Sequence, residues 1–126
     1  MSEEMRATHI LRALHGFFNR FADAWAEGCA PDDAVFPYIT YAPTVPGELE
    51  RVTFNARVWY RSRQYEAVAA LVDAIDAAIG PGCRIPAGGG AIWVYKSDRF
   101  MQLAPMREDP DLKCALLSLA LAANTR

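Results

Sequence analysis

The sequence predicts an α+β domain built around an antiparallel β-sheet that is covered on one side. Apolar residues recur at three- and four-residue spacing over about residues 6–26 and 63–79, which is typical of amphipathic helices. Residues 51–60 alternate between apolar and polar side chains, as in a strand with one buried face. Because 126 residues is the size of one domain, we expect a single domain over 1–126.

Composition narrows the class of protein. Hydrophobic residues make up 52% of the chain, which fits a compact globule rather than a disordered chain. The formal net charge of −2 supplies no global basic field for binding nucleic acid. No apolar run approaches the roughly 18 residues that span a bilayer, and the acidic start lacks the basic region of a signal peptide. We therefore expect a soluble protein with no membrane segment and no signal peptide.

The first predicted helix, about 6–26, carries an apolar stripe that we expect to face the core rather than a ligand. Gly28 and Pro31 predict its end. The stripe consists of Ile10, Leu14, Phe17, Phe21 and Trp25, with Leu11 and Phe18 beside it.

Two strands are predicted next, at about 35–41 and 51–60. Pro37 favours an edge position or an irregular entry for the first, because proline cannot donate to a sheet. The segment 42–50 between them lacks periodicity and is predicted to be an exposed loop. Along 51–60, one face carries Val52, Phe54, Ala56, Val58 and Tyr60, and the other carries Arg51, Thr53, Asn55, Arg57 and Trp59.

The second helix, about 63–79, is predicted to begin after Ser62 as a cap and to end at Gly80-Pro81-Gly82. Beyond it, Gly88-Gly89-Gly90 is predicted to be a turn rather than a phosphate loop, because no Lys-Ser or Lys-Thr follows and the next residues suit a strand. Strands at about 91–96 and 99–105 are predicted to form a hairpin. Segment 112–122 stays ambiguous, since its Leu and Ala content favours helix while its alternation suits a strand.

Residue chemistry predicts no catalytic, cofactor-binding or metal-binding site. The chain has an odd number of cysteines, three, and they are widely spaced: Cys29, Cys83 and Cys114. This pattern favours neither a disulfide framework nor a zinc site. His9 and His15 lie about 240° apart around a helix, so they do not share a metal. We interpret the helix carboxylates Asp73 and Asp76 as solvated charges. The chain is therefore expected not to be an enzyme.

One surface stands out as a candidate for a subunit or partner interface: Arg57, Trp59, Arg61 and Arg63. Basic groups beside aromatics can hold single-stranded nucleic acid, but this cluster is small and the chain is net acidic. The arginines also suit ion pairs with neighbouring carboxylates. Arginine and tryptophan are both enriched where proteins meet, so the same residues suit a protein partner.

Several segments together resemble small proteins encoded in head–tail joining clusters of long-tailed bacteriophages and prophages, the tail terminator or tail completion proteins. The likeness covers the chain from about residue 35 onwards. It rests on Pro37-Tyr38-Ile39-Thr40-Tyr41, Val58-Trp59-Tyr60-Arg61-Ser62, Leu71-Val72-Asp73-Ala74-Ile75, Gly89-Gly90-Ala91-Ile92-Trp93-Val94-Tyr95-Lys96 and Asp109-Pro110.

The resemblance implies two main helices packed on one face of a mostly antiparallel β-sheet, with 112–122 as a strand. It also implies a structural virion protein, present in the host bacterial cytoplasm during assembly and then in the tail or neck. There it forms a homo-oligomeric ring, commonly a hexamer, at the head-proximal end of the tail. Its partners are copies of itself, the tail tube protein and head-connector proteins. DNA passes through the lumen without sequence-specific binding, and a net acidic chain suits such a channel because phosphates and carboxylates repel.

Two other functions remain open from sequence. One is a small non-catalytic module that binds a ligand or a protein in a pocket between the first helix and the sheet. The other is an enzyme with a non-standard site that uses Cys83 or Asp73. Mass in solution separates the ring from the module, and neighbouring genes separate a virion role from a metabolic one.

Overall fold

Six strands form one sheet in a computed structural model that describes residues 3–48, 50–106 and 108–124. The order across the sheet is β1-β2-β3-β6-β5-β4. Strands β1 and β2 are parallel and every other neighbouring pair is antiparallel. Along the chain the elements are α1 (Glu3–Asn19), β1 (Asp23–Ala26), β2 (Tyr38–Tyr41), β3 (Arg51–Arg61), α2 (Glu66–Ile79), β4 (Cys83–Ala87), β5 (Gly90–Met106) and β6 (Asp109–Asn124).

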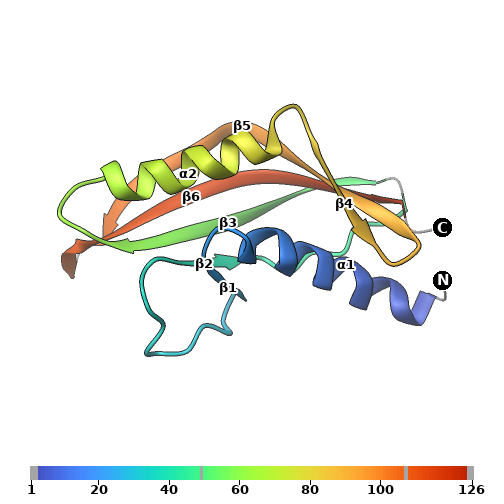
Figure 1. The fold of residues 1–126 in the computed structure, drawn as a ribbon, viewed down its shortest axis with the longest axis horizontal. Helices are drawn as coiled ribbons and strands as arrows, with labels where there is room; N and C mark the ends of the chain where they lie inside the picture. Colours follow the sequence, from blue (N-terminus) through green and yellow to red (C-terminus); the bar gives the residue numbers. More distant parts are fainter. Residues whose placement is uncertain (1–2, 49, 107, 125–126) are drawn as a thin grey trace.

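The predicted fold class is wrong. The chain is mostly β, with 48% of residues in strands and 25% in helix, and its mixed sheet curls into a half-barrel (Figure 1). The prediction of two main helices packed on one face of a mostly antiparallel sheet overestimates the helical part of the fold. The two longest strands are β5 and β6, which run for 17 and 16 residues. Strands of this length accumulate right-handed twist, which curls the sheet.

The predicted first helix, 6–26, is too long. Helix α1 ends at Asn19, whose side-chain Oδ1 accepts a hydrogen bond from the backbone N–H of Ala24, 3.2 Å away. Residues 23–26 form β1, in which Ala24 is buried and Trp25 lies on the opposite side of the sheet. Phe21 and Trp25 continue the helical spacing of the stripe by coincidence, which explains the error.

The predicted hairpin at 91–96 and 99–105 is also wrong, because both segments belong to the single strand β5. Each part pairs with β6, and the register shifts between Lys96 and Met101. Arg99, with φ of 54°, lies within this irregularity. The turn-forming residues between the two segments are therefore absorbed as a bulge instead of reversing the chain.

Helix α2 begins at Glu66 rather than at residue 63. Tyr65 is the N-cap and makes no side-chain capping bond, while the Ser62 hydroxyl accepts from the backbone N–H of Gln64, 3.2 Å away. At the other end Gly80 has φ of 53° and donates its N–H to the Asp76 carbonyl. A left-handed glycine satisfies that carbonyl without steric cost, which ends the helix there.

The core lies inside the curl of the sheet. Cross-strand neighbours on β3 and β6, such as Phe54 with Leu119 and Ala56 with Leu117, share this inner face. Helix α2 packs on β3, β5 and β6. Helix α1 contacts both β1 and β4, the two opposite edges of the sheet, and so bridges the open side of the half-barrel (Figure 1). Among the residues described, no helix is long and apolar enough to cross a membrane.

Candidate functional site: the uncovered sheet face

The sheet has a second face that alternates with the core positions and that neither helix covers. On β3, Ala56 and Val58 point inward and are at most 1% exposed, so Arg57 and Trp59 point outward. The pairing register extends this outer sheet face to the other strands, because side chains directly opposite one another share a face. Its residues include Trp25, Tyr38, Thr40, Arg51, Arg57, Trp59, Arg84, Trp93, Tyr95, Cys114 and Leu116.

All three tryptophans of the chain lie on this outer face and none lies in the core. Two of them flank Tyr38. The Trp25 and Tyr38 rings meet edge-on with centroids 5.9 Å apart, and the Tyr38 and Trp59 rings stack at 6.2 Å. We call these three residues the aromatic row. Tryptophan on an uncovered face, rather than in the core, is typical of a protein–protein contact.

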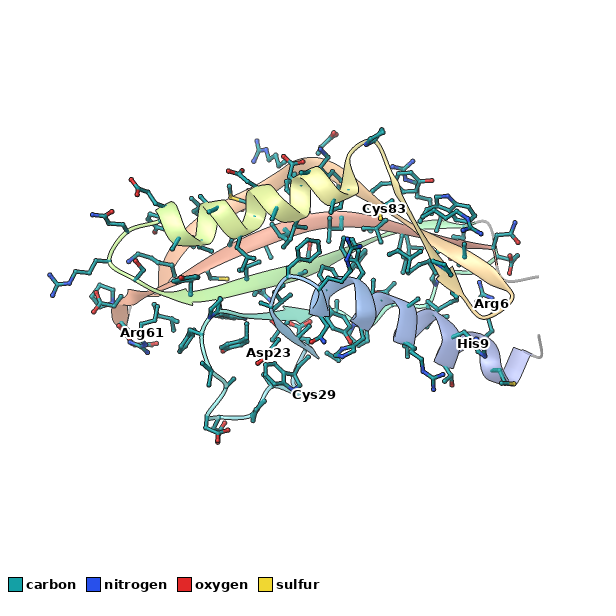
Figure 2. All side chains as sticks on the ribbon, viewed as in Figure 1. Arg6, His9, Asp23, Cys29, Arg61 and Cys83 are labelled. Atoms are coloured by element: carbon teal, nitrogen blue, oxygen red, sulfur yellow. The ribbon has the colours of Figure 1, made fainter. Side chains whose placement is uncertain are left out.

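The predicted interface residues occupy three different settings. Arg57 and Trp59 lie together on the outer face, and Arg61 lies at the end of β3 with its guanidinium 5.3 Å from the Phe36 ring centroid. Arg63 follows the strand, and its side chain is 90% exposed. Figure 2 shows Arg61 at the end of the molecule opposite Arg6.

Each of the three arginines pairs with a carboxylate of the same chain. Arg57 meets Glu27 at 3.2 Å, Arg61 meets Asp109 at 2.5 Å and Arg63 meets Asp111 at 3.7 Å. The hydrogen bond from Arg61 holds the pKa of the Asp109 carboxyl below its usual value. These pairs agree with the ion-pair interpretation of the arginines. Because these arginines are already paired within the chain, the aromatic row is the main feature at this end of the sheet that is available for contact with a partner.

A second group on the outer face was missed by sequence reasoning. Arg51, Trp93 and Arg84 lie in one row across β3, β5 and β4, and Tyr95 lies beside them. The Arg51 guanidinium covers the Tyr95 ring at 4.0 Å from its centroid. We call these four residues the arginine patch. The alternation of residues 51–60 predicts that Arg51 points outward. The sequence does not predict β4 as a strand, so it does not place Arg84 beside Trp93.

Burial also raises the pKa of two groups on the outer face, which keeps both of them protonated. Desolvation raises the pKa of the Cys114 thiol and of the Tyr38 hydroxyl. Cys114 is 6% exposed and lies opposite Trp59. This raised pKa disfavours the thiolate, so Cys114 acts as a small apolar group beneath the aromatic row.

Three of the residues considered for catalysis or metal binding, Asp76, His15 and His9, contact other parts of the chain. Asp76 pairs with Lys96 at 2.5 Å, and the Nδ1 atom of His15 is 3.1 Å from the Tyr41 hydroxyl. His9 lies against Gly88, in the turn between β4 and β5. Over the described ranges, no group of three or more His, Cys, Asp or Glu side chains is placed to hold a metal ion.

The space between α1 and the sheet, where a binding module would need its pocket, is filled by core side chains. Ile10, Leu14 and Phe18 are each 0% exposed. Phe18 stacks on Tyr41 with centroids 5.2 Å apart and meets Phe54 edge-on at 6.3 Å. The outer face is therefore the side of the sheet that stays open to a partner.

Comparison with solved structures finds the same fold in a chain from the virion of a native gene transfer agent particle. That match has a TM-score of 0.62 at 12% identity and covers 98% of this chain and 96% of that chain. A second solved structure, described only by a sequence identifier, matches with a TM-score of 0.60 at 12% identity, covering 100% of this chain and 98% of that one. No family model and no curated protein matches the sequence.

Proposed function

We propose that this protein is a structural component of a phage or phage-like virion, a tail terminator or tail completion protein of the neck region. It forms a ring at the head-proximal end of the tail and joins the tail to the head. One observation carries the proposal: the fold is shared, over nearly the full length of both chains, with a chain of a gene transfer agent virion.

The outer sheet face supports the same role. Monomeric proteins rarely leave a sheet face bearing several tryptophans uncovered, because burying such rings is favourable. The aromatic row of Trp25, Tyr38 and Trp59 offers this kind of contact surface, with polar groups around it. A ring subunit needs surfaces for its neighbours, for the tail tube protein and for the head connector.

Charge is consistent with a channel for DNA. The chain has a formal net charge of −2, so the ring as a whole repels phosphate and lets DNA pass without sequence-specific binding. A strongly basic lumen in the assembled ring would contradict this part of the proposal.

The direct test is to add the purified protein to tail tubes assembled from the tail tube protein of the same phage or phage-like particle. Electron microscopy should show density at one end of each tube, and tubes capped in this way should join filled heads. Uncapped tubes, and tubes mixed with an unrelated protein of similar size and charge, should not join heads. Binding along the tube wall, or head joining that proceeds equally without the protein, would contradict the proposal.

A further inference from the structure

The arginine patch contains two exposed arginines, Arg51 and Arg84. Among the described residues, Arg51 and Arg84 take part in no ion pair, in contrast to Arg57, Arg61 and Arg63. Both side chains are exposed, and they bracket the half-buried ring of Trp93. Three strand spacings of about 4.8 Å put their Cα atoms about 14 Å apart. The patch is therefore an aromatic strip with one positive charge at each side.

A complementary segment lies in the loop between β1 and β2. Asp32 and Asp33 are exposed, and within the part of the chain that the structure describes neither forms an ion pair. Two residues further on, Val35 is 73% exposed, the highest value among the large exposed apolar side chains. Figure 1 shows this loop projecting away from the sheet. The loop thus presents two carboxylates followed by an apolar side chain.

The loop cannot reach the patch of its own molecule. It leads into Tyr38, which pairs with Trp59, whereas the patch begins at Arg51, at the other end of β3. Eight residues of strand separate those positions, a distance of about 27 Å. The patch also lies toward the β4 edge, and the loop lies at the β1–β2 edge.

We propose that the acidic loop 31–35 of one copy docks on the arginine patch of a second copy. This inference rests on the proposed ring and identifies the contact between its subunits. Asp32 and Asp33 meet Arg51 and Arg84, and Val35 packs on the Trp93 ring. Because the two surfaces differ and lie at opposite corners of the sheet, the contact is head-to-tail, which closes into a ring when the rotation per copy allows.

Pairing of edge strands between copies is less favourable for assembly, since both edge strands lack a free backbone N–H at one position. Edge strand β4 contains Pro86, which has no N–H to donate. On edge strand β1, the Ala24 N–H is already bonded to the Asn19 side chain. Side-chain contact through the loop and the patch avoids both obstacles.

The test is a charge swap in the full-length protein, read by mass in solution at low salt. Arg51→Glu with Arg84→Glu should weaken self-association by about tenfold or more, and so should Asp32→Arg with Asp33→Arg, because like charges then face each other. Mixing the two double variants should restore association, since each loop then meets a patch of opposite charge. The chain with all four changes should also associate.

Two controls separate the contact from folding and from net charge. Arg12→Glu with Arg20→Glu changes net charge as much as the patch variant does, but at one residue of α1 and at the residue that follows its end, and should leave association unchanged. Each variant should keep the thermal midpoint of the wild type, because all the substituted side chains are exposed.

The inference fails if both double variants associate like the wild type, if the mixture and the fourfold variant stay monomeric, or if the wild type itself is monomeric at every concentration. These failures differ from failure of the proposed function. A wild-type protein that caps tail tubes while its charge variants do so equally well overturns only the loop-to-patch contact.

Discussion

The indole Nε1–H of Trp59 donates a hydrogen bond to the Thr40 hydroxyl, 3.0 Å away, across the neighbouring strands β2 and β3. The only polar atom of the tryptophan side chain is thereby satisfied within the molecule. Tyr38 stacks on the same ring and restricts its rotation. Trp59 is thus held rigid and partly open on the outer sheet face, which lowers the entropy lost when a partner covers it.

Trp59→Ala should therefore weaken assembly more than folding. Trp59 lies outside the buried core, so we expect about 1 kcal/mol of lost monomer stability. At an interface, loss of a tryptophan anchor costs about 2 kcal/mol or more, which is about thirtyfold in association constant. Urea unfolding of the monomer and sedimentation of the assembled protein measure the two effects separately.

Thr40→Val is the matched control, since it removes the acceptor but keeps the ring. We expect a small loss of association. If Trp59→Ala lowers monomer stability and association by equal free energies, Trp59 serves the fold and the aromatic row is not an interface.

Gly88 is the most constrained glycine in the β4–β5 turn. Its φ is 59°, and a Cβ atom there would collide with the His9 ring of α1. Gly88→Ala should destabilise the protein by about 1–3 kcal/mol, because it adds backbone strain to the collision. Thermal or urea unfolding checks this value.

Gly89→Ala next to it is the control, since no atom lies within 4 Å of its added Cβ. Its effect should stay within about 0.5 kcal/mol. Adding His9→Ala to Gly88→Ala should recover the part of the loss that comes from the collision. Equal effects at the two glycines would show that α1 does not pack against this turn.

Sequence patterns located most of the strands but not their continuity. The alternation of β3 was read correctly because one face is core and the other is polar. The sequence predicts a hairpin turn near Arg99, where the structure has a β-bulge. Turn-forming residues in a short segment fit both a hairpin turn and a bulge inside one strand. Tertiary pairing with β6 decides between the two outcomes, and that information is not local.

The same limit applies to the candidate site. The alternation along one strand predicts that Arg57 and Trp59 point outward, and the structure places both on the outer face. Arg84 and Trp93 were missed as a pair because their proximity depends on the register between β4 and β5. The sequence places Arg51 on the correct face. Its contact with Tyr95 spans β6, which lies between β3 and β5, and the local sequence of β3 or β5 does not predict it.

Adjacent leucines on β6 test the assignment of the two faces. Leu117 is 0% exposed and faces Ala56 in the core, while Leu116 points to the outer face opposite Arg57. Leu117→Ala should cost about 2–5 kcal/mol, as large-to-small changes in a packed core do. Leu116→Ala should cost the isolated monomer about 1 kcal/mol. Reversed values in chemical denaturation would show that the register of β6 is shifted by one residue.

The Arg61–Asp109 pair predicts how stability depends on pH. The Arg61 hydrogen bond lowers the pKa of Asp109 in the folded protein below its ordinary value of 3.8. A carboxyl with a depressed folded pKa stabilises the protein above its unfolded pKa, and that contribution is lost as pH falls through the folded pKa. The unfolding free energies of the wild type and Asp109→Asn should therefore differ by a constant amount above about pH 5 and converge below about pH 4.

Arg61→Gln should lose the largest part of this pH dependence and Asp109→Asn all of it, because the backbone N–H groups of Asp111 and Leu112 still lower the pKa of Asp109 in Arg61→Gln. Asp98→Asn, at an exposed carboxylate that forms no ion pair among the described residues, should run parallel to the wild type at every pH. If the gap between wild type and Asp109→Asn persists unchanged to about pH 2, the stabilisation comes from something other than the charged pair, and the end of β3 is not held by Arg61.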